Sequence, residues 1–180
     1  MGFVCRVCGG TGHVYDISDD RYSCERCSVV FDHPDIFSLP EVMIKKLSDD
    51  AIIPVRAKEG DVGYDIYASH EQWIPAGEIK LIKTDISIEL PPCTEAQIRS
   101  RSGMGKKGIM VANQPGTIDT GYRGMCGVLL FNSRNSGYKV NKGDKVAQML
   151  ITTKLAYTFK EVNELSETDR GDSGFNSTGR

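Results

Sequence analysis

Short apolar runs broken by turn residues dominate the chain after residue 40. In residues 86–90, isoleucine or leucine at every second position alternates with serine and glutamate, so one face of the segment is apolar and the other polar. Further short apolar runs lie at residues 42–44, 79–84, 108–111, 127–131, 138–140, 145–151 and 155–162. No segment shows a long helical period. The pattern therefore predicts an all-β domain, either a barrel or a double-sheet roll.

The two ends of the chain follow other patterns. Residues 1–31 are too few to bury a core by themselves, and residues 32–40, which contain Pro34 and Pro40, have the composition of a linker. The last residues are polar and then rich in glycine and serine, which predicts a flexible tail. The sequence therefore divides into a first unit (1–31), a linker (32–40), a β domain (41–162) and a C-terminal tail (163–180).

The first unit contains two pairs of cysteines with the spacing of a zinc site. Cys5 and Cys8 are separated by two residues, as are Cys24 and Cys27, and fifteen residues lie between the pairs. Two such pairs can place four thiolates around one Zn²⁺, and a metal would stabilise a segment this short. We therefore predict a structural zinc in a unit that resembles a zinc ribbon, with four unrelated thiols as the alternative.

The composition is that of an ordinary globular protein. Of the 180 residues, 39% are hydrophobic, and the formal net charge of -2 does not mark the whole chain as a nucleic-acid binder. No stretch is apolar enough to span a membrane, and the first residues lack the hydrophobic region of a secretion signal. We therefore expect the protein in the cytoplasm, or in the host cytoplasm if its source is a virus. In that compartment cysteines favour metal binding or free thiols over disulfides.

A glycine-rich stretch at residues 116–125 holds the first candidate for catalysis. Gly121 and Gly124 allow backbone and ligand to approach closely, and near them lie one carboxylate, Asp119, and one aromatic ring, Tyr122. The stretch predicts a β-hairpin, on which a held carboxylate such as Asp119 could accept a proton from an attacking water. An ordinary hairpin with turn-forming aspartate and glycine is the alternative.

Four other short stretches combine glycine with charged or amide side chains. Asp65 is suited to hold Mg²⁺ through water, Arg101 and Ser102 open a predicted short helix that suits phosphate oxygens, and Gln148 offers an amide. Each of them alone is also typical of an ordinary surface turn or strand end. The stretches are residues 63–66 (Gly-Tyr-Asp-Ile), 101–104 (Arg-Ser-Gly-Met), 143–148 (Gly-Asp-Lys-Val-Ala-Gln) and 170–179 (Arg-Gly-Asp-Ser-Gly-Phe-Asn-Ser-Thr-Gly).

Together with residues 116–125, these stretches form an ordered set that resembles the five motifs of the trimeric dUTPases. The resemblance covers residues 41–180. It implies a jelly-roll-like β domain and a homotrimer in which three subunits share each active site. It also implies an enzyme, dUTP diphosphatase, with Mg²⁺ bound alongside the substrate. Such an enzyme hydrolyses dUTP to dUMP and pyrophosphate by attack of water at the α-phosphorus, which limits uracil in DNA and supplies dUMP.

The resemblance also implies roles for individual residues. Asp119 orients the attacking water, Tyr122 packs under the deoxyribose, and Phe175 in the tail stacks on the uracil as the tail closes like a lid. The substrate-binding residues that it implies are Arg101, Ser102, Gly103, Asn113, Gly116, Ile118, Tyr122, Gln148, Arg170, Phe175, Ser177 and Thr178.

Three positions in or beside the motifs, and the whole first unit, depart from the family pattern. One is Gly105, which stands where alanine is common. Gly121 stands where many members have aspartate, and Asn176 replaces a common glycine in the tail, which could alter how the lid closes. The zinc-ribbon-like unit lies outside the pattern. It is a candidate contact to a protein or a nucleic acid.

Two other functions are compatible with much of the same sequence. A dCTP deaminase of the same fold carries a glutamate as proton shuttle in the strand after the hairpin, whereas this chain has Leu129 near that place. A nucleotide-switched binding or regulatory protein would use the zinc unit to reach its partner. The intact Asp119 favours turnover, and release of pyrophosphate from dUTP would separate the two.

Overall fold

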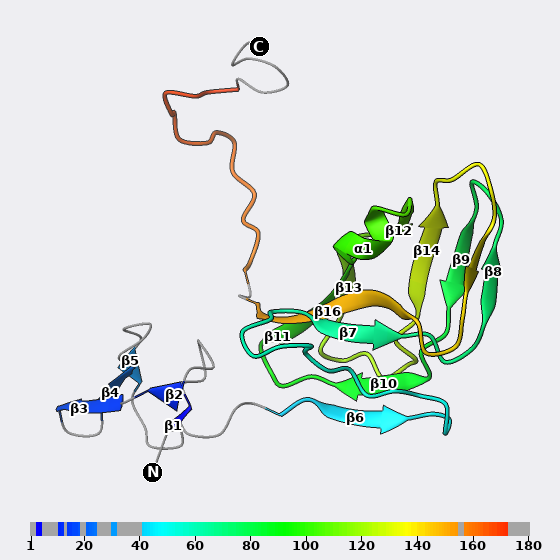
Figure 1. Cartoon of the computed structure of the whole chain (residues 1–180). Helices are drawn as coiled ribbons and strands as arrows, with labels where there is room; N and C mark the ends of the chain where they lie inside the picture. The colour runs from blue at the N-terminus through cyan, green and yellow to red at the C-terminus, as the bar shows by residue number, and fades with distance from the viewer. Residues whose placement is uncertain are drawn as a thin grey trace.

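The computed structural model describes residues 41–154 and 157–172, and within residues 1–40 the backbone of the strand segments 3–4, 11–12, 14–18, 21–24 and 30–31. Strands make up nearly all the regular structure of this part of the chain, with one short helix, α1 (Ser102–Gly105) (Figure 1). The predicted all-β class is therefore confirmed. Within the same residues, no helix is long and apolar enough to cross a membrane.

The largest sheet joins most of the segments that carry candidate site residues. All its pairings are antiparallel, and its register places Gln148 directly opposite Asp65. Residues that lie far apart in the sequence therefore meet on one face of this sheet. In order across the sheet, the strands are β13 (Gly116–Ile118), β11 (Thr94–Arg99), β16 (Lys145–Thr153) and β7 (Tyr64–Tyr67).

A second sheet and two strand pairs complete the domain, again with antiparallel pairing throughout. The strand predicted at residues 138–140 is found with those bounds. The second sheet contains β12 (Ile109–Val111), β14 (Val128–Asn132) and β9 (Ile79–Ile82). The pairs are β10 (Ile86–Glu89) with β6 (Met43–Lys46), and β15 (Tyr138–Val140) with β8 (Gln72–Ile74).

One apolar core lies between these sheets. Its fully buried side chains come from several sheets, among them Ile66 of β7, Ile74 of β8, Ile82 of β9, Leu130 of β14 and Val146 of β16. Branched side chains fit the pleated, buried surface of strands, which explains why isoleucine and valine dominate the core. The burial of these residues holds the strands that carry the site residues in place.

The described strand segments of residues 1–40 form two small antiparallel arrangements. One is the pair β1 (Phe3–Val4) and β2 (Thr11–Gly12). The other is the sheet β3 (Val14–Ser18), β4 (Arg21–Cys24) and β5 (Val30–Phe31). The predicted division of the chain at residues 31 and 40 stays a prediction.

The hairpin predicted at residues 116–125 is wrong. β13 pairs with β11, whereas β14 pairs with β12 and β9, so the two flanking strands belong to different sheets. The residues between them form a turn in which the Tyr122 N–H donates to the carbonyl of Asp119 at 3.0 Å. Pairing with strands distant in sequence therefore replaced the local pairing that the pattern suggested.

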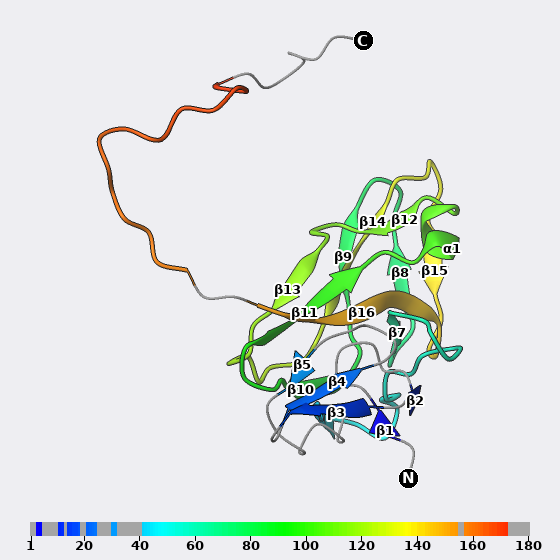
Figure 2. The same cartoon turned by 90° about the vertical axis from the view of Figure 1, so that its left-hand side faces the viewer.

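The strand predicted at residues 155–162 is also wrong for its described part, residues 157–162. The Lys154 N–H donates to the Cys93 carbonyl at 2.9 Å, and residues 157–172 then run away from the domain as an extended arm (Figures 1 and 2). Tyr157 and Phe159, the source of the alternating pattern, are exposed on this arm. Alternation alone does not form a strand without a neighbouring strand to pair with.

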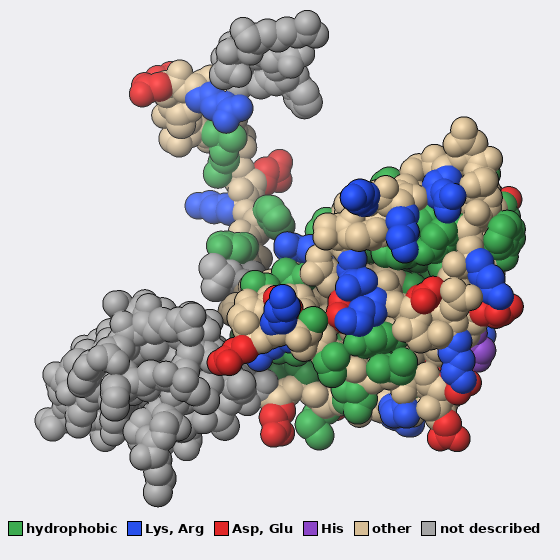
Figure 3. Space-filling view, viewed as in Figure 1, with side chains coloured by type: hydrophobic (Ala, Val, Ile, Leu, Met, Phe, Trp, Pro, Cys, Tyr) green, Lys and Arg blue, Asp and Glu red, His purple; other side chains and the backbone are tan. Residues whose placement is uncertain are grey.

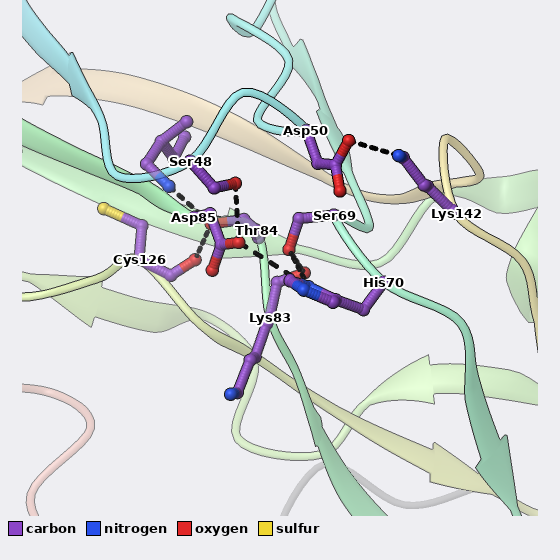
Figure 4. A network of polar contacts seen from close by, with 10 residues as sticks. Ser48, Asp50, Ser69, His70, Lys83, Thr84, Asp85, Cys126 and Lys142 are labelled. Carbon is purple, nitrogen blue, oxygen red and sulfur yellow. Dashed lines mark hydrogen bonds and ion pairs between the residues drawn. The ribbon is translucent and has the colours of Figure 1, made fainter.

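Polar contacts fasten the turns at one end of the domain (Figure 4). Ser48 Oγ donates to Asp85 Oδ2 at 2.8 Å, and His70 Nδ1 lies 3.5 Å from the same oxygen. Thr84 Oγ1 donates to the carbonyl of Cys126 at 2.6 Å. Burial raises the pKa of the Cys126 thiol to about 11, so this thiol is neutral at physiological pH. The bond from Thr84 holds the segment that joins the Asp119 turn to β14.

Candidate active site

A pocket of about 410 Å³ opens beside the Asp119 turn. Leu81, Met125 and Leu129 give it apolar walls, and Asn113, Asp119 and Tyr122 add polar groups to its lining. Gly116 and Ile118 line it as well. Sites for planar ligands combine apolar walls with a few placed polar groups. We refer to this site as the turn pocket.

Hydrogen bonds fix the turn that carries Asp119. Thr120 Oγ1 donates to the carbonyl of Thr94, and Arg123 Nη1 donates to the carbonyl of Thr120 at 2.7 Å. Ser87 Oγ donates to the carbonyl of Arg123 at 2.6 Å. The Asp119 carboxylate is exposed on this braced turn, where it can accept a proton from water without moving the backbone.

Tyr122 lies across the backbone of Gly124. A Cβ atom added to Gly124 would collide with the Tyr122 hydroxyl and ring, and the hydroxyl donates to the carbonyl of Met125 at 3.2 Å. Glycine is therefore required at position 124 for the ring to take this position. The ring is 46% exposed, so one part of it faces the pocket opening, where it can pack against a ligand.

A second pocket, of about 310 Å³, lies at the start of α1. Charged and amide groups from two strands, the start of the helix and a loop line it, and we call it the cation pocket. Its lining includes Asp65, Arg101, Ser102, Gly103 and Gln148. Figure 3 shows Lys and Arg side chains gathered over the region of α1, β7 and β16, with few acidic ones among them.

An ion-pair cluster forms one wall of the cation pocket. The buried carboxylate of Asp65 lies between two cations, with Oδ1 2.8 Å from Arg101 Nε and Oδ2 2.7 Å from Lys145 Nζ. Arg101 Nη1 also donates to the Lys145 carbonyl at 3.3 Å. The hydrogen bond that the Lys145 ammonium donates to the Asp65 carboxylate raises the pKa of Lys145 above its ordinary value, so the ammonium stays charged at neutral pH.

Gln148 is held from two sides. Its Nε2 donates to the carbonyl of Ser100 at 3.0 Å, and its Oε1 lies so close to Gly63 that a Cβ atom there would collide with it. The amide is therefore oriented before any ligand binds, which reduces the entropy lost on binding.

The cation pocket suits the triphosphate part of a magnesium nucleotide more than a resident metal. No group of three or more metal-ligating side chains occurs among the described residues. Mg²⁺ keeps several waters and is carried mostly by substrate phosphates, so one nearby carboxylate acting through water is enough. Asp65 has that chemistry, although both its oxygens already contact cations. Its predicted role toward Mg²⁺ stays a prediction.

The remaining predicted site residues lie at the chain ends. Arg170 is on the extended arm. Phe175, Ser177 and Thr178 fall outside the described residues, as do Cys5, Cys8 and Cys27. Cys24 ends β4, of which the backbone is described.

Sequence reasoning missed Lys145 and Gly63 as parts of the site. Both lie inside the quoted stretches, but glycine and lysine are common in turns and carry no specific signal there. Only the pairing of β7 with β16 shows that Lys145 reaches Asp65 and that Gly63 makes room for Gln148.

The turn pocket and the cation pocket share no lining residue. One is largely apolar with a single exposed carboxylate, and the other is polar, with the ion-pair cluster of Asp65, Arg101 and Lys145 beside it. The fold and these pockets define an all-β protein suited to a ligand with a flat apolar part and a polyanionic part.

Comparison with known proteins identifies the family. The dUTPase family model matches residues 49–179. A deoxyuridine 5'-triphosphate nucleotidohydrolase of Clostridioides difficile is 52% identical over 137 residues, which is 76% of this chain and 96% of that protein. One from Crocosphaera subtropica is 50% identical over 140 residues, which is 77% of this chain and 99% of that protein.

Solved structures give the same result. A Staphylococcus bacteriophage 80alpha dUTPase with dUpNHpp is 27% identical, with a TM-score of 0.73 over 78% of this chain and 99% of that one. A mutant dUTPase from phage phi11 of S. aureus, described with a structural Mg(II) ion, has a TM-score of 0.64 at 27% identity, over 69% of this chain and 97% of that one. The chain belongs to the dUTPase family.

Proposed function

We propose that this protein is a dUTP diphosphatase, which hydrolyses dUTP to dUMP and pyrophosphate and so limits uracil in DNA and supplies dUMP. The observation that carries the proposal is the exposed Asp119 carboxylate on a braced turn beside an apolar pocket. The relatives named deoxyuridine 5'-triphosphate nucleotidohydrolase match this chain over nearly their whole length.

In the proposed mechanism the turn pocket binds the nucleoside. Asn113 and the backbone of Gly116 and Ile118 face the uracil edge, and Tyr122 packs under the deoxyribose, where a 2'-hydroxyl would clash. Asp119 orients the attacking water and accepts its proton as the water attacks the α-phosphorus. The bond between the α-phosphorus and its bridging oxygen breaks, and pyrophosphate leaves.

The cation pocket binds the triphosphate in this mechanism. Arg101, Ser102, Gly103 and Gln148 contact phosphate oxygens, and charge-assisted hydrogen bonds from a guanidinium are strong. Mg²⁺ bound to the substrate supplies further charge neutralisation, with Asp65 as the carboxylate that reaches it through water.

We also propose that the protein works as a homotrimer with shared active sites. The two pockets share no lining residue, and outward-facing apolar residues lie side by side on β9 and β14. Leu81 pairs directly with Leu129 and Ile79 with Phe131; Ile79, Leu81 and Leu129 are exposed. Leu81 and Leu129 also line the turn pocket, and burial of the part of the strip outside it, at Ile79 and Phe131, against other copies would be stabilising. A mass measurement in solution tests this state.

The arm and tail act as the lid in this proposal. The tail contributes Arg170, Ser177 and Thr178 to the phosphates and Phe175 to the uracil. Closure excludes water other than the nucleophile from the reaction.

We further propose that residues 1–31 bind one structural Zn²⁺ through Cys5, Cys8, Cys24 and Cys27. The strand registers support this. Val4 pairs with Thr11 and Ser23 pairs with Val30, so Cys5 and Cys24 each directly follow a residue that pairs across to a strand on the far side of the cysteine pair, and Cys24 also pairs with Val14. Two cysteine pairs with matching places in the sequence, each beside a paired strand segment, suit a four-thiolate site. Elemental analysis that finds no zinc near one per chain would remove this proposal.

The zinc unit is also the candidate contact to a protein or nucleic acid, and the cytoplasm is the expected location. A deaminase role is disfavoured because Leu129, which lines the turn pocket, offers no group to move a proton.

Hydrolysis of dUTP in ¹⁸O-labelled water tests the proposed reaction. Attack at the α-phosphorus puts the label in dUMP, and attack at the β-phosphorus puts it in pyrophosphate. Release of ammonia would indicate deamination, and tight nucleotide binding without release of pyrophosphate would indicate a switch protein.

A further inference from the structure

A bulge in β16 determines which side chain faces the cation pocket. Gln148 pairs with Asp65 and Ala147 with Ile66, but the register then shifts, and Lys145 rather than Val146 pairs with Tyr67. Val146 and Ala147 are consecutive residues and both are fully buried, which fits a bulge that interrupts the alternation of this strand.

The register shift moves Lys145 to the face that carries Asp65 and Gln148. Tyr67 is two residues from Asp65 and so shares its face, and the residue opposite Tyr67 points the same way. The Lys145 ammonium accordingly reaches Asp65 Oδ2 at 2.7 Å and lies 5.9 Å from the centroid of the Tyr67 ring. Without the bulge, the apolar Val146 would lie opposite Tyr67 and beside Asp65.

From this position Lys145 acts on Arg101 in two ways. Its side chain binds one oxygen of the Asp65 carboxylate while Arg101 Nε binds the other, and its own carbonyl accepts a hydrogen bond from Arg101 Nη1 at 3.3 Å. The Arg101 guanidinium is therefore fixed through Nε and Nη1 before a ligand arrives.

We infer that Lys145 is a positioning residue for the triphosphate: acting through Asp65, it holds the Arg101 guanidinium in the orientation that receives phosphate oxygens. This inference rests on the proposed function, since it assigns Lys145 to the phosphate part of that site. A fixed guanidinium loses less conformational freedom on binding than a free one, so Lys145 contributes to affinity for the triphosphate.

Replacement of the ammonium tests the inference. In Lys145→Met, Asp65 keeps Arg101 as its sole side-chain cation, and the pair can rotate together. We expect about threefold to tenfold weaker binding of a non-hydrolysable imido analogue of dUTP, the scale of immobilising one long side chain. Binding of dUMP should change little, because dUMP lacks the β- and γ-phosphates. In turnover, KM should rise while kcat changes little.

Three further comparisons separate positioning from general stability. Lys145→Arg keeps a cation beside Asp65 and should restore most of the affinity. In a double-mutant cycle, Asp65→Asn combined with Lys145→Met should cost less than the sum of the single changes, because both act through Arg101. Lys139→Met is the control. Lys139 lies on β15 and forms an exposed ion pair with Glu71, and its replacement should leave binding of the analogue unchanged.

The affinity for the non-hydrolysable analogue is measured by calorimetry, which does not depend on turnover. Lys145→Met with parental affinity for the analogue would overturn the inference, as would equal losses for the analogue and dUMP or a failure of Lys145→Arg to recover binding. A parent protein that binds the analogue but releases no pyrophosphate from dUTP would overturn the proposed function and leave the role of Lys145 standing.

Discussion

The turn pocket and the cation pocket are built on opposite principles. The turn pocket owes its shape to missing side chains and short turns, with Gly116 in its wall and Gly124 beneath Tyr122. The cation pocket owes its character to side chains that hold one another, with Asp65 between Arg101 and Lys145. The first suits recognition of shape and of a base edge, and the second suits recognition of charge.

This difference assigns separate tasks to the two pockets. Shape and edge recognition discriminates strongly between similar nucleosides, because a wrong base leaves buried polar groups unpaired. Charge recognition provides affinity and orientation but does not distinguish one triphosphate from another. Changes to the two pockets should therefore give different kinetic signatures.

The largest expected effect is discrimination by the turn pocket among nucleotides. The ratio of kcat/KM for dUTP to that for dCTP should reach about 10⁴, the scale for a site that reads a base edge by hydrogen bonds. UTP should be rejected as well, because Tyr122 leaves no room for a 2'-hydroxyl. Kinetics with the three nucleotides measure this, and comparable kcat/KM for dUTP and UTP would contradict the role of Tyr122.

Removal of the reactive carboxylate should come next. Asp119→Asn keeps the size of the side chain but not its basicity, so kcat should fall by about 10²–10⁴-fold while the affinity for the imido analogue is retained. Glu78→Gln, in an exposed ion pair with Lys80, is the matched control and should leave kcat unchanged. If Asp119→Asn turns over dUTP like the parent, Asp119 does not activate the water.

Deletion of the lid should affect the two pockets together. A chain that ends at Thr168 loses Arg170 and the segment with Phe175, and its kcat/KM should fall by about 10²-fold, as for loss of a positioning element. The melting temperature without nucleotide should hardly change, because residues 157–172 lie outside the core. Full activity of the truncated protein would show that the tail is not a lid.

The smallest expected effect concerns salt. Ions screen exposed charges, so raising the ionic strength to about 1 M should weaken analogue binding at the cation pocket by several-fold. Discrimination between dUTP and dCTP belongs to the turn pocket and should stay nearly constant across the same series. If discrimination and affinity fell together, the separation of tasks would be wrong.

The sequence predicted the strands better than it predicted their partners. The runs at residues 79–84, 86–90 and 138–140 each contain an observed strand, although their apolar side chains are not all buried: Ile79 and Leu81 of β9 are exposed. The hairpin at residues 116–125 and the strand at 155–162 failed for the same reason. Strand pairing depends on segments distant in the chain, and the local hydrophobic pattern does not predict which segment is the partner.

The site shows the same limit. Asp65, Arg101 and Gln148 were chosen from the sequence, and the structure brings them to one pocket. Lys145 was not chosen, because the bulge that turns it toward Asp65 arises from the packing of Val146 and Ala147 in the core. A single extra residue in a strand changes the face of every residue beyond it, and such a shift leaves no trace in composition or spacing.

The close approach of Gly63 to Gln148 has a consequence for how this gene can vary. A single methyl group at position 63 would strike the Gln148 amide, so even alanine, the smallest replacement, should be eliminated under selection for activity. The exposed Glu59, four positions earlier, should accept most substitutions in the same experiment. In a saturation library, loss of activity for every replacement at position 63 would show that the site needs the empty space there. Gly63 itself has no side chain that could take part in the reaction.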